Sequence, residues 1–518
     1  MVAEGASHCL RPRTAMLGLL ALVTVTACSA PDPRPNVVLV SVDTLRRDAL
    51  PTRSEDLAEL PSLHRLVNES VVYETALSPA SWTLPAHASV LTGLYPDRHG
   101  ATDVRTTMDL AAARLPEILR RAGYTTAAFT GGGFVGRAYG MDAGFDRFDE
   151  VPEIPADLAA GRRLGPFEEA REFLSHHRST APFLLLVHSY VVHDYNHYGA
   201  DVGFHDPENA GTEAERYLDC LVGRSTCGPA TWDRLQRLYG FAVETALAAV
   251  DDLLEALERS GLRDRTVVIL FSDHGEGFDV ELQRTSHGGR LHADLLDIPL
   301  LIRAPALPPR HSREPASLVD VMPTVLQLCG LDPLTAGMLD GRSLAAPGDG
   351  GPSPGSRMLL AFEHGFYWRQ GRRFQSDNIQ DRALAVAAVD NASWWIRSSR
   401  TVERYDRIGD PRQATDLWSG EAWPEERLHR RPQARPGTPL IEDHNTVFER
   451  LRALGNGVEA LETMKQHGHD VALVLLDWNM PEMNGYDTLV ALRADPSWAK
   501  TPVMMVTTEA EKKNVVQA

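Results

Sequence analysis

The chain is poor in cysteine and has no surplus of positive charge. Five cysteines occur in 518 residues, and none of them has the spacing of a zinc finger. Acidic residues outnumber basic ones, the formal net charge is −18, and no basic stripe offsets it. No nucleic-acid partner is therefore expected, because a phosphate backbone is bound by clustered cationic side chains.

An apolar run long enough to span a bilayer is also missing near the N-terminus. The run from Met16 to Ala27 has only twelve residues, follows two arginines, and ends in a Val-Thr-Ala-Cys sequence that resembles a bacterial lipoprotein cleavage box. We expect residues 1–27 to be a lipoprotein signal peptide, Cys28 to be acylated, and residues 28–35 to form a stiff tether. A plain secretory signal is the alternative. Both interpretations predict an extracytoplasmic protein, and the first anchors it to a membrane, in the periplasm or at the cell surface.

Three cysteines follow the tether. An oxidising compartment permits a disulfide between Cys220 and Cys227, which would close a small surface loop. Cys329 lies in an apolar helical pattern and is expected to be buried and inert.

Continuous apolar runs alternate with helical patterns along most of the chain. Strands are predicted at Asn36–Asp43, Tyr124–Phe129, Phe183–His188 and Val267–Asp273, and helices at Leu110–Ala122 and Thr231–Ser260. This order predicts an α/β fold with a large, mostly parallel sheet sandwiched by helices. A Pro/Gly-rich stretch at 346–355 separates a catalytic domain at 36–345 from a smaller α/β subdomain at 346–455.

A threonine hydroxyl stands at the predicted start of a helix. Thr83 opens this segment, and Pro85 lies within the first turn. Free backbone N–H groups at a helix start favour an anion such as phosphate or sulfate. A hydroxyl beside that anion becomes a nucleophile only if its pKa is lowered, usually by a metal ion. The alternative is a purely structural role, in which Thr83 only caps the helix.

Candidate metal ligands follow the ends of two predicted strands. Asp43 ends the first strand, and Asp273 and His274 emerge together from another. The carboxyl ends of parallel strands converge at one sheet edge, so these three groups are expected to bind a divalent ion, with Thr83 completing the site. The imidazole ligand favours zinc or manganese, and calcium is the alternative.

The number of metal ions stays open between one and two. His193 and His287 could hold a second ion, with help from Asp194 or His197. Alternatively, the two histidines donate hydrogen bonds to the ester oxygens around a single ion. Carboxylate-poor sites are unusual for hard metals, so neither interpretation is preferred.

Several neighbouring residues have a structural interpretation. His87 and His99 are expected to hold the helix start and a turn, and His292 to pack or face solvent. Glu276 either supports a ligand or is solvated. The pair Trp394-Trp395 is expected in the core of the smaller subdomain.

Residues 36 to about 454 resemble the sulfatase branch of the alkaline phosphatase superfamily. The matching segments are Asn36–Asp43, Thr83–Gly100, Ser272–Glu276, Val319–Thr324, Leu339–Leu344 and Glu403–Asp406 with Asp410 and Pro411. The resemblance implies an enzyme that attacks a sulfate or phosphate ester and forms a covalent intermediate, which is later hydrolysed. It implies catalytic roles for Thr83, His193 and His287.

Departures from the family pattern affect the expected chemistry. Sulfatases carry Cys or Ser in a Cys-x-Pro-x-Arg sequence and convert it to formylglycine, whereas this chain has Thr83 and, at the arginine position, His87. Asp43 is followed by Thr44 where sulfatases usually have a second acid. A threonine nucleophile resembles the phosphodiesterase and phosphonate-hydrolase members, so phosphate or phosphonate esters are favoured over sulfate esters. The expected substrate is a small-molecule, glycan or lipid ester, and no protein partner is predicted. A non-catalytic ester-binding lipoprotein is an alternative.

Residues 456–518 resemble part of a response-regulator receiver. Asp477 matches the phosphoacceptor and Thr507 the switch residue. A receiver also needs an acidic pair after its first strand and a lysine after its fifth; Glu442-Asp443 lies too close to Asn456 to supply the first, and no such lysine follows. The segment is therefore predicted to be an incomplete receiver that does not signal. A phosphorelay protein with a hydrolase-like module is the competing hypothesis.

Overall fold

The structure is a computed structural model of the chain. It describes residue 32 and residues 34–51, 57–153, 165–195, 228–345 and 357–424, with gaps inside these ranges, and the short pieces 438–439, 461, 474–477, 485–494 and 503–506. The predicted signal peptide, Cys28 and the Cys220–Cys227 pair lie outside the described residues.

A central eight-stranded sheet forms the body of the molecule. Its order is β12 (Arg310–Ser312), β2 (Val71–Tyr73), β11 (Leu300–Arg303), β8 (Thr266–Phe271), β1 (Asn36–Val42), β7 (Phe183–Ser189), β5 (Thr125–Thr130), β6 (Arg147–Glu150). All pairings are parallel except those of β11 with β8 and β2. The predicted α/β class with a large, mostly parallel sheet is confirmed.

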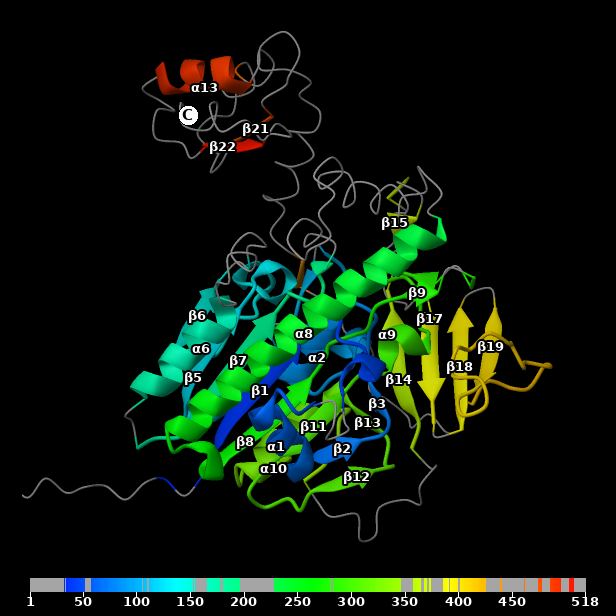
Figure 1. Ribbon diagram of the computed structural model, residues 1–518, viewed down its shortest axis with the longest axis horizontal. Helices are drawn as coiled ribbons and strands as arrows, with labels where there is room; N and C mark the ends of the chain where they lie inside the picture. Colours follow the sequence, from blue (N-terminus) through cyan, green and yellow to red (C-terminus); the bar gives the residue numbers. More distant parts are fainter. Residues whose placement is uncertain are drawn as a thin grey trace, which may run out of the picture.

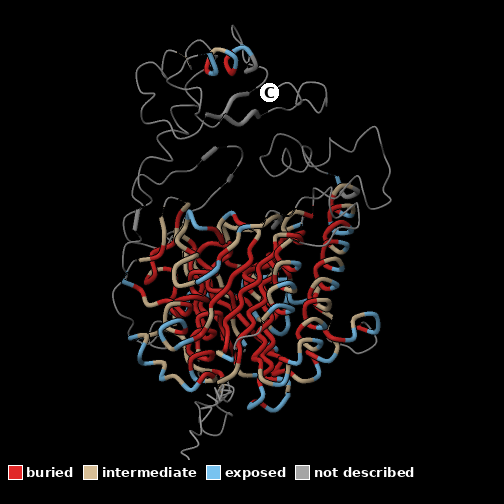
Figure 2. The backbone as a smooth tube through the Cα atoms, turned by 90° about the vertical axis from the view of Figure 1, so that its left-hand side faces the viewer, coloured by how far each residue is buried: buried red, intermediate tan, exposed pale blue. Residues whose placement is uncertain are grey.

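Helices cover both faces of this sheet (Figure 1). One face packs against α1 (Pro61–Glu69), α6 (Gly165–His176) and α8 (Pro229–Arg259), and the other against α2 (Thr83–Thr92), α4 (Leu115–Arg121) and α10 (Val321–Leu328). Alternate residues of β1 enter the two apolar cores, Val38 and Val40 on one side and Val37 and Leu39 on the other. Burial of both faces explains why the strands are continuously apolar, and Figure 2 shows the buried residues concentrated in the sheet.

Two helices bear on the sequence predictions, α4 through its start and α10 through Cys329 at its end. The helix predicted from Leu110 begins later, at Leu115, because Pro116 occupies its second position and fixes its start. Cys329 is buried at the end of α10, as expected. Among the described helices, none combines the length and apolar character that crossing a bilayer requires.

A smaller antiparallel sheet follows in the chain. Its order is β14 (Leu359–Glu363), β17 (Ala385–Val389), β18 (Ser393–Ser398), β19 (Val402–Asp406). Trp394 and Trp395 are buried in its two apolar clusters, which confirms the expected core. The described part of 357–424 contains no helix of its own, and α9 (Ala293–Leu296) of the large domain packs against it instead.

Short elements complete the described chain. They are η1 (Arg47–Ala49), β3 (Ala76–Leu77), α3 (Pro96–His99), β4 (Thr106–Thr107), η3 (Gly133–Val135), η4 (Arg137–Tyr139), η6 (Arg263–Arg265), β9 (Phe278–Asp279), β10 (Arg284–Thr285), β13 (Ala316–Ser317), η7 (Leu318–Asp320), η8 (Pro333–Ala336), β15 (Trp368–Arg369), β16 (Arg372–Arg373) and β20 (Thr438–Pro439).

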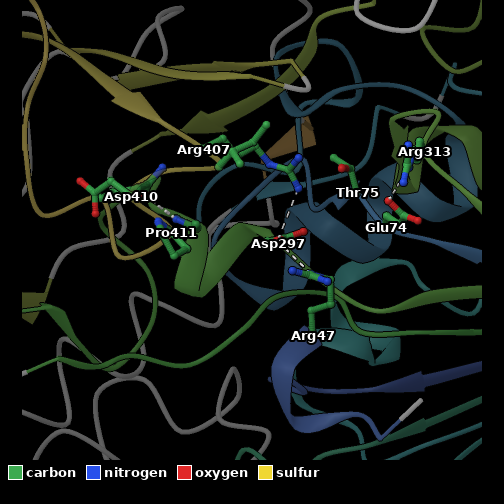
Figure 3. Close-up of a pocket in the computed structure, with 11 residues that line it drawn as sticks. Arg47, Glu74, Thr75, Asp297, Arg313, Arg407, Asp410 and Pro411 are labelled. Atoms are coloured by element: carbon green, nitrogen blue, oxygen red, sulfur yellow. Dashed lines mark hydrogen bonds and ion pairs between the residues drawn. The ribbon is translucent and has the colours of Figure 1, made fainter. Parts of the chain in front are cut away.

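A charged junction lies between the large domain and the smaller sheet (Figure 3). Asp297 Oδ2 lies 2.9 Å from Arg47 Nε and 3.6 Å from a guanidinium nitrogen of Arg407, which follows β19. The cavity around them, about 630 Å³, is also lined by Arg313 and by the acids Glu74 and Asp410. Three arginines and three acids balance each other, so we interpret this cavity as an interdomain junction.

The receiver-like segment forms a strand, a helix and a strand. β21 (Val474–Asp477) pairs in parallel with β22 (Val503–Val506), and α13 (Gly485–Ala494) lies between them in the sequence. Asp477 is the last residue of β21, as predicted for a phosphoacceptor position. Thr507 lies outside the described residues.

Candidate active site

The predicted acids and histidine meet at one edge of the central sheet. Asp43 follows β1 directly, and Asp273 and His274 follow β8 after one residue. Because Ser41 lies opposite Phe271 in the parallel register, the two strand ends are neighbours. Asp43, Asp273 and His274 are completely buried, and their ligand atoms all lie within 4.8 Å of one another.

Thr83 reaches this cluster from the start of α2. Its Oγ1 donates a hydrogen bond to Asp43 Oδ2 at 3.1 Å and lies 3.3 Å from His274 Nε2. Trp82 occupies the N-cap position, and Thr83 is the first residue of the helix. The interpretation of Thr83 as a simple N-cap is therefore wrong, and its hydroxyl is aimed at the acidic cluster.

The cluster has the chemistry of a divalent-metal site. Asp43 Oδ1 and Asp273 Oδ2 are buried and have no hydrogen-bond partner among the described residues. Burial, together with the charge of Asp273, raises the pKa of Asp43 well above its usual range. A cation would satisfy both oxygens and offset their repulsion, so the residues present fit a bound divalent ion.

His274 is prepared to act as a neutral ligand. Its Nδ1 lies 3.0 Å from the carbonyl oxygen of Gly275, so this nitrogen carries the proton and Nε2 presents a lone pair to the cluster. Burial lowers the pKa of His274 well below its usual value. Gly275 is required here because a Cβ at that position would lie 2.1 Å from the carbonyl oxygen of Asp294.

Thr44 occupies the position where sulfatases usually place a second acid. Its backbone has a φ of 55°, a left-handed conformation that is costly for a β-branched residue. In this conformation its N–H donates to Asp273 Oδ1 at 3.3 Å, while Tyr239 donates to its carbonyl oxygen at 2.9 Å. The strained backbone thus orients Asp273.

His193 and His287 lie beside the cluster, each paired with an acid. His193 Nδ1 is 2.7 Å from Asp194 Oδ1, and His287 Nδ1 is 2.9 Å from Glu276 Oε2. Burial alone would lower the pKa of both histidines, but the hydrogen bond to Asp194 and the charge of Glu276 outweigh it and raise both values. Ring centroids are 5.0 Å apart between His193 and His287 and 4.8 Å apart between His274 and His287.

The pairing of His193 and His287 with acids bears on whether they bind a second metal ion or donate hydrogen bonds to the ester. Among the described residues, neither group with ligand atoms close enough for a metal ion contains His193, Asp194 or His287. Imidazoles paired with acids are suited to donating hydrogen bonds to an ester oxygen. A second metal ion stays a prediction. Glu276 is buried rather than solvated, and His197 lies outside the described residues.

Sequence reasoning missed His188. This residue is buried near the end of β7, opposite Ser41 of β1, and its Nε2 lies 3.4 Å from Asp43 Oδ2. Burial lowers its pKa to about 4, so the ring is neutral at pH 7. His188, His87 and Asp273 form a second group whose ligand atoms lie within 4.8 Å of one another. The only sequence signal was a histidine at the end of an otherwise apolar predicted strand, Phe183–His188.

The other histidines have structural contacts. His87 Nδ1 lies 3.0 Å from the carbonyl oxygen of Thr83, and its Nε2 lies 3.0 Å from Ser41 Oγ. His99 Nε2 lies 3.1 Å from the carbonyl oxygen of Pro85, and its Nδ1 accepts from the N–H of Ala101 at 3.1 Å, so the two rings hold the start of α2 and the turn after α3. His292 packs against Tyr405, with a ring-centroid distance of 5.8 Å.

Curated relatives support the assignment of the hydrolase part. An endo-4-O-sulfatase of Bacteroides thetaiotaomicron is 25% identical over 396 residues, which cover 64% of this chain and 77% of the relative. An N-acetylgalactosamine-6-sulfatase of Rattus norvegicus is 24% identical over 396 residues, covering 65% of this chain and 70% of the relative.

Solved structures show the same fold. A phosphonate monoester hydrolase of Agrobacterium radiobacter aligns with a TM-score of 0.52 and 18% identity, covering 76% of this chain and 94% of that one. A protein in complex with its substrate D-glucosamine-2-N,6-O-disulfate aligns with a TM-score of 0.53 and 16% identity, covering 84% and 98%.

Two family models match the chain. The response regulator receiver domain matches residues 439–518, a range that begins before the predicted boundary at 456 and includes Glu442-Asp443. The sulfatase model matches residues 35–331, which carry the central sheet and the buried cluster of Asp43, Asp273 and His274. The chain therefore belongs to the sulfatase family, a family of hydrolases that act on ester bonds, and carries a receiver domain at its C-terminus.

Proposed function

We propose that the chain hydrolyses phosphate or phosphonate esters in preference to sulfate esters, with Thr83 as the nucleophile. The observation that carries the proposal is the position of Thr83 Oγ1, 3.1 Å from Asp43 Oδ2 and 3.3 Å from His274 Nε2. A divalent cation held by Asp43, Thr83, Asp273 and His274 would lower the pKa of the hydroxyl and offset the charge of the ester. The imidazole favours zinc or manganese over calcium.

The preference for phosphorus rests on the identity of the nucleophile. Formylglycine is made from cysteine or serine, and Thr83 is neither. The hydroxyl of Thr83 must therefore attack directly, and its own ester must then be hydrolysed. The sulfatase names of the curated relatives supply the competing hypothesis, in which this chain acts on a sulfated glycan.

The first step transfers the phosphoryl group to the protein. Thr83 Oγ1 forms a bond to phosphorus while the bond from phosphorus to the leaving oxygen breaks. The hydroxyl proton moves to Asp43 Oδ2, to which Thr83 already donates. The leaving oxygen takes a proton from His193 or His287, both of which have raised pKa values.

The second step restores the protein. Water attacks phosphorus and gives a proton to the imidazole that was deprotonated in the first step. The bond between Thr83 Oγ1 and phosphorus breaks, and Oγ1 recovers its proton from Asp43 Oδ2. All protein groups then return to their starting protonation states.

A parallel assay of Thr83 variants tests this function. Purified protein is supplied with zinc, manganese or calcium and assayed on aryl phosphate, bis-aryl phosphate, aryl phosphonate and aryl sulfate esters. Thr83→Ala is expected to lower kcat by on the order of 10³-fold or more, and Thr83→Ser to retain turnover. Thr92→Ala is the matched control, because it removes a buried hydroxyl at the other end of α2.

The outcomes separate the hypotheses. Turnover of sulfate esters alone would overturn the proposed preference for phosphate and phosphonate esters. If the wild-type protein binds an ester but hydrolyses none, and Thr83→Ala binds it equally well, the result would support the non-catalytic alternative. We also propose, from the sequence alone, that the protein is exported and anchored through Cys28; absence of radioactive palmitate from the mature protein would contradict the anchor.

A further inference from the structure

A carboxylate from the smaller sheet lies beside the active-site segments. Glu363 is the last residue of β14 and is completely buried. Its Oε2 accepts a hydrogen bond from Ser81 Oγ at 2.7 Å and another from the backbone N–H of Gly289 at 3.2 Å. Two donors from the large domain therefore converge on one oxygen of the smaller sheet.

These donors belong to the two segments that carry the proposed chemistry. Ser81 precedes Thr83 by two residues, and Gly289 follows His287 by two. The segments also touch directly, since the N–H of Gly288 donates to the carbonyl oxygen of Ser81 at 2.9 Å. Glu363 thus joins the segment of the nucleophile to the segment of a candidate proton donor.

The backbone conformation of residues 286–289, which include His287, depends on contacts with other parts of the chain. Ser286, Gly288 and Gly289 have φ values of 60°, 75° and 71°, which place them in the left-handed region. Serine adopts this conformation at a cost, so the surrounding structure must hold it in place. The hydrogen bond from Gly289 to Glu363 is one of the contacts that do so.

The position of Glu363 is itself fixed. Its backbone pairs with Ala385 of β17, and the preceding residue, Phe362, donates its N–H to the carbonyl oxygen of Pro79 at 2.9 Å. A buried carboxylate destabilises the folded protein unless hydrogen-bond donors satisfy it. Removing the donors to Glu363, or removing its carboxylate, should therefore change the local structure measurably.

We propose that Glu363 is a positioning residue through which the smaller sheet sets the distance between Thr83 and His287. The inference rests on the proposed function, because it assigns Glu363 an effect on that reaction. Glu363 acts as an acceptor through Oε2, so a carbonyl oxygen at the same place performs the same task. Glutamine preserves that acceptor, and alanine removes it.

The test compares Glu363→Gln with Glu363→Ala. We expect Glu363→Gln to keep kcat and KM within about threefold of wild type, and Glu363→Ala to lower kcat by about 10- to 100-fold with a smaller change in KM. Ser81→Ala, which removes one of the two donors, should give an intermediate loss. Arg412→Ala is the control, because it removes exposed ion pairs from the segment after β19 to Asp279 and Glu281 of the large domain, away from Ser81 and Gly289.

Hydrogen exchange measured by mass spectrometry provides a readout without turnover. Glu363→Ala should speed exchange in peptides that contain residues 81–83 and 286–289, with β17 and β18 unchanged. A kcat for Glu363→Ala equal to that of wild type, an equal loss in Glu363→Gln, or faster exchange throughout the smaller sheet would each overturn the proposal. If the wild-type protein hydrolyses no ester, the proposed function fails, while the exchange comparison still tests the positioning contact.

Discussion

Glu276 and His287 form a pair in which the carboxylate Oε2 lies 2.9 Å from the imidazole Nδ1. Glu276 is buried, and the positive charge of His287 outweighs the effect of burial and lowers the pKa of Glu276. The charge of Glu276 in turn raises the pKa of His287 against the opposing effect of burial. The pair therefore favours a cationic imidazole beside His274, whose Nε2 lies 3.3 Å from Oγ1 of the proposed nucleophile Thr83.

The first prediction concerns the pH dependence of this pair. A proton donor with a raised pKa works at low pH and is lost as the pH rises through that pKa. Glu276→Gln removes the charge that raises the pKa of His287, so the alkaline limb of the kcat/KM profile should move to lower pH. Profiles measured between pH 5 and 9 check this, with Glu281→Gln, an exposed acid, as the control. An alkaline limb that stays in place would exclude His287 as the donor.

The second prediction concerns His188 and metal affinity. Its Nε2 lies 3.4 Å from Oδ2 of Asp43, which is a proposed metal ligand. Groups that orient a ligand contribute to metal affinity, so His188→Gln should weaken binding of zinc or manganese by about 10- to 100-fold. Competition with a chelator of known affinity measures this. The exposed His176→Gln variant should bind the metal as the wild type does, and equal affinities in all three proteins would contradict the assignment.

The sequence predicted that the candidate metal ligands would meet, because each of them follows the end of a strand. Asp43, Asp273 and His274 come after continuous apolar runs, and parallel strand ends meet at one sheet edge. His188 was missed although it ends the predicted strand Phe183–His188, because only the register between β1 and β7 brings it next to Asp43. Glu363 was missed for a similar reason. Its partners Ser81 and Gly289 are remote in sequence, and docking of the smaller sheet is not encoded in any local pattern.

The third prediction concerns stability away from the site. Arg357 donates two hydrogen bonds of 2.7 Å to Asp320, which is completely buried and also accepts from the N–H of Ser317 and of Arg342. Arg357→Ala leaves this carboxylate buried without its counter-ion. We expect a loss of about 3–5 kcal/mol in the free energy of unfolding, measured by denaturant titration. Arg313→Ala, at an exposed site, should change stability by less than about 0.5 kcal/mol.

The fourth prediction concerns the charged junction. Arg47 and Arg407 share the carboxylate of Asp297 (Figure 3). Asp297→Asn removes that charge and leaves two guanidinium groups facing each other, so the smaller sheet should detach more readily. Limited proteolysis should cleave the segments near 357–424 faster in this variant, by about tenfold for a weakening of about 1.4 kcal/mol. Equal cleavage rates would mean that other contacts alone hold the sheet.

The last prediction concerns the receiver segment, which differs from the hydrolase in composition. All four lysines of the chain lie in it (Lys465, Lys500, Lys512 and Lys513), whereas residues 1–455 carry arginine only. Asp477 ends β21 at the phosphoacceptor position. A receiver binds magnesium through an acidic pair after its first strand, and Glu442-Asp443 lies too close to Asn456 to supply that pair. We therefore expect acetyl phosphate to leave Asp477 unlabelled, in the wild-type protein as in Asp477→Asn, by phosphate-affinity electrophoresis. A shifted band that appears only in the wild-type protein would show a functional receiver and favour the phosphorelay hypothesis.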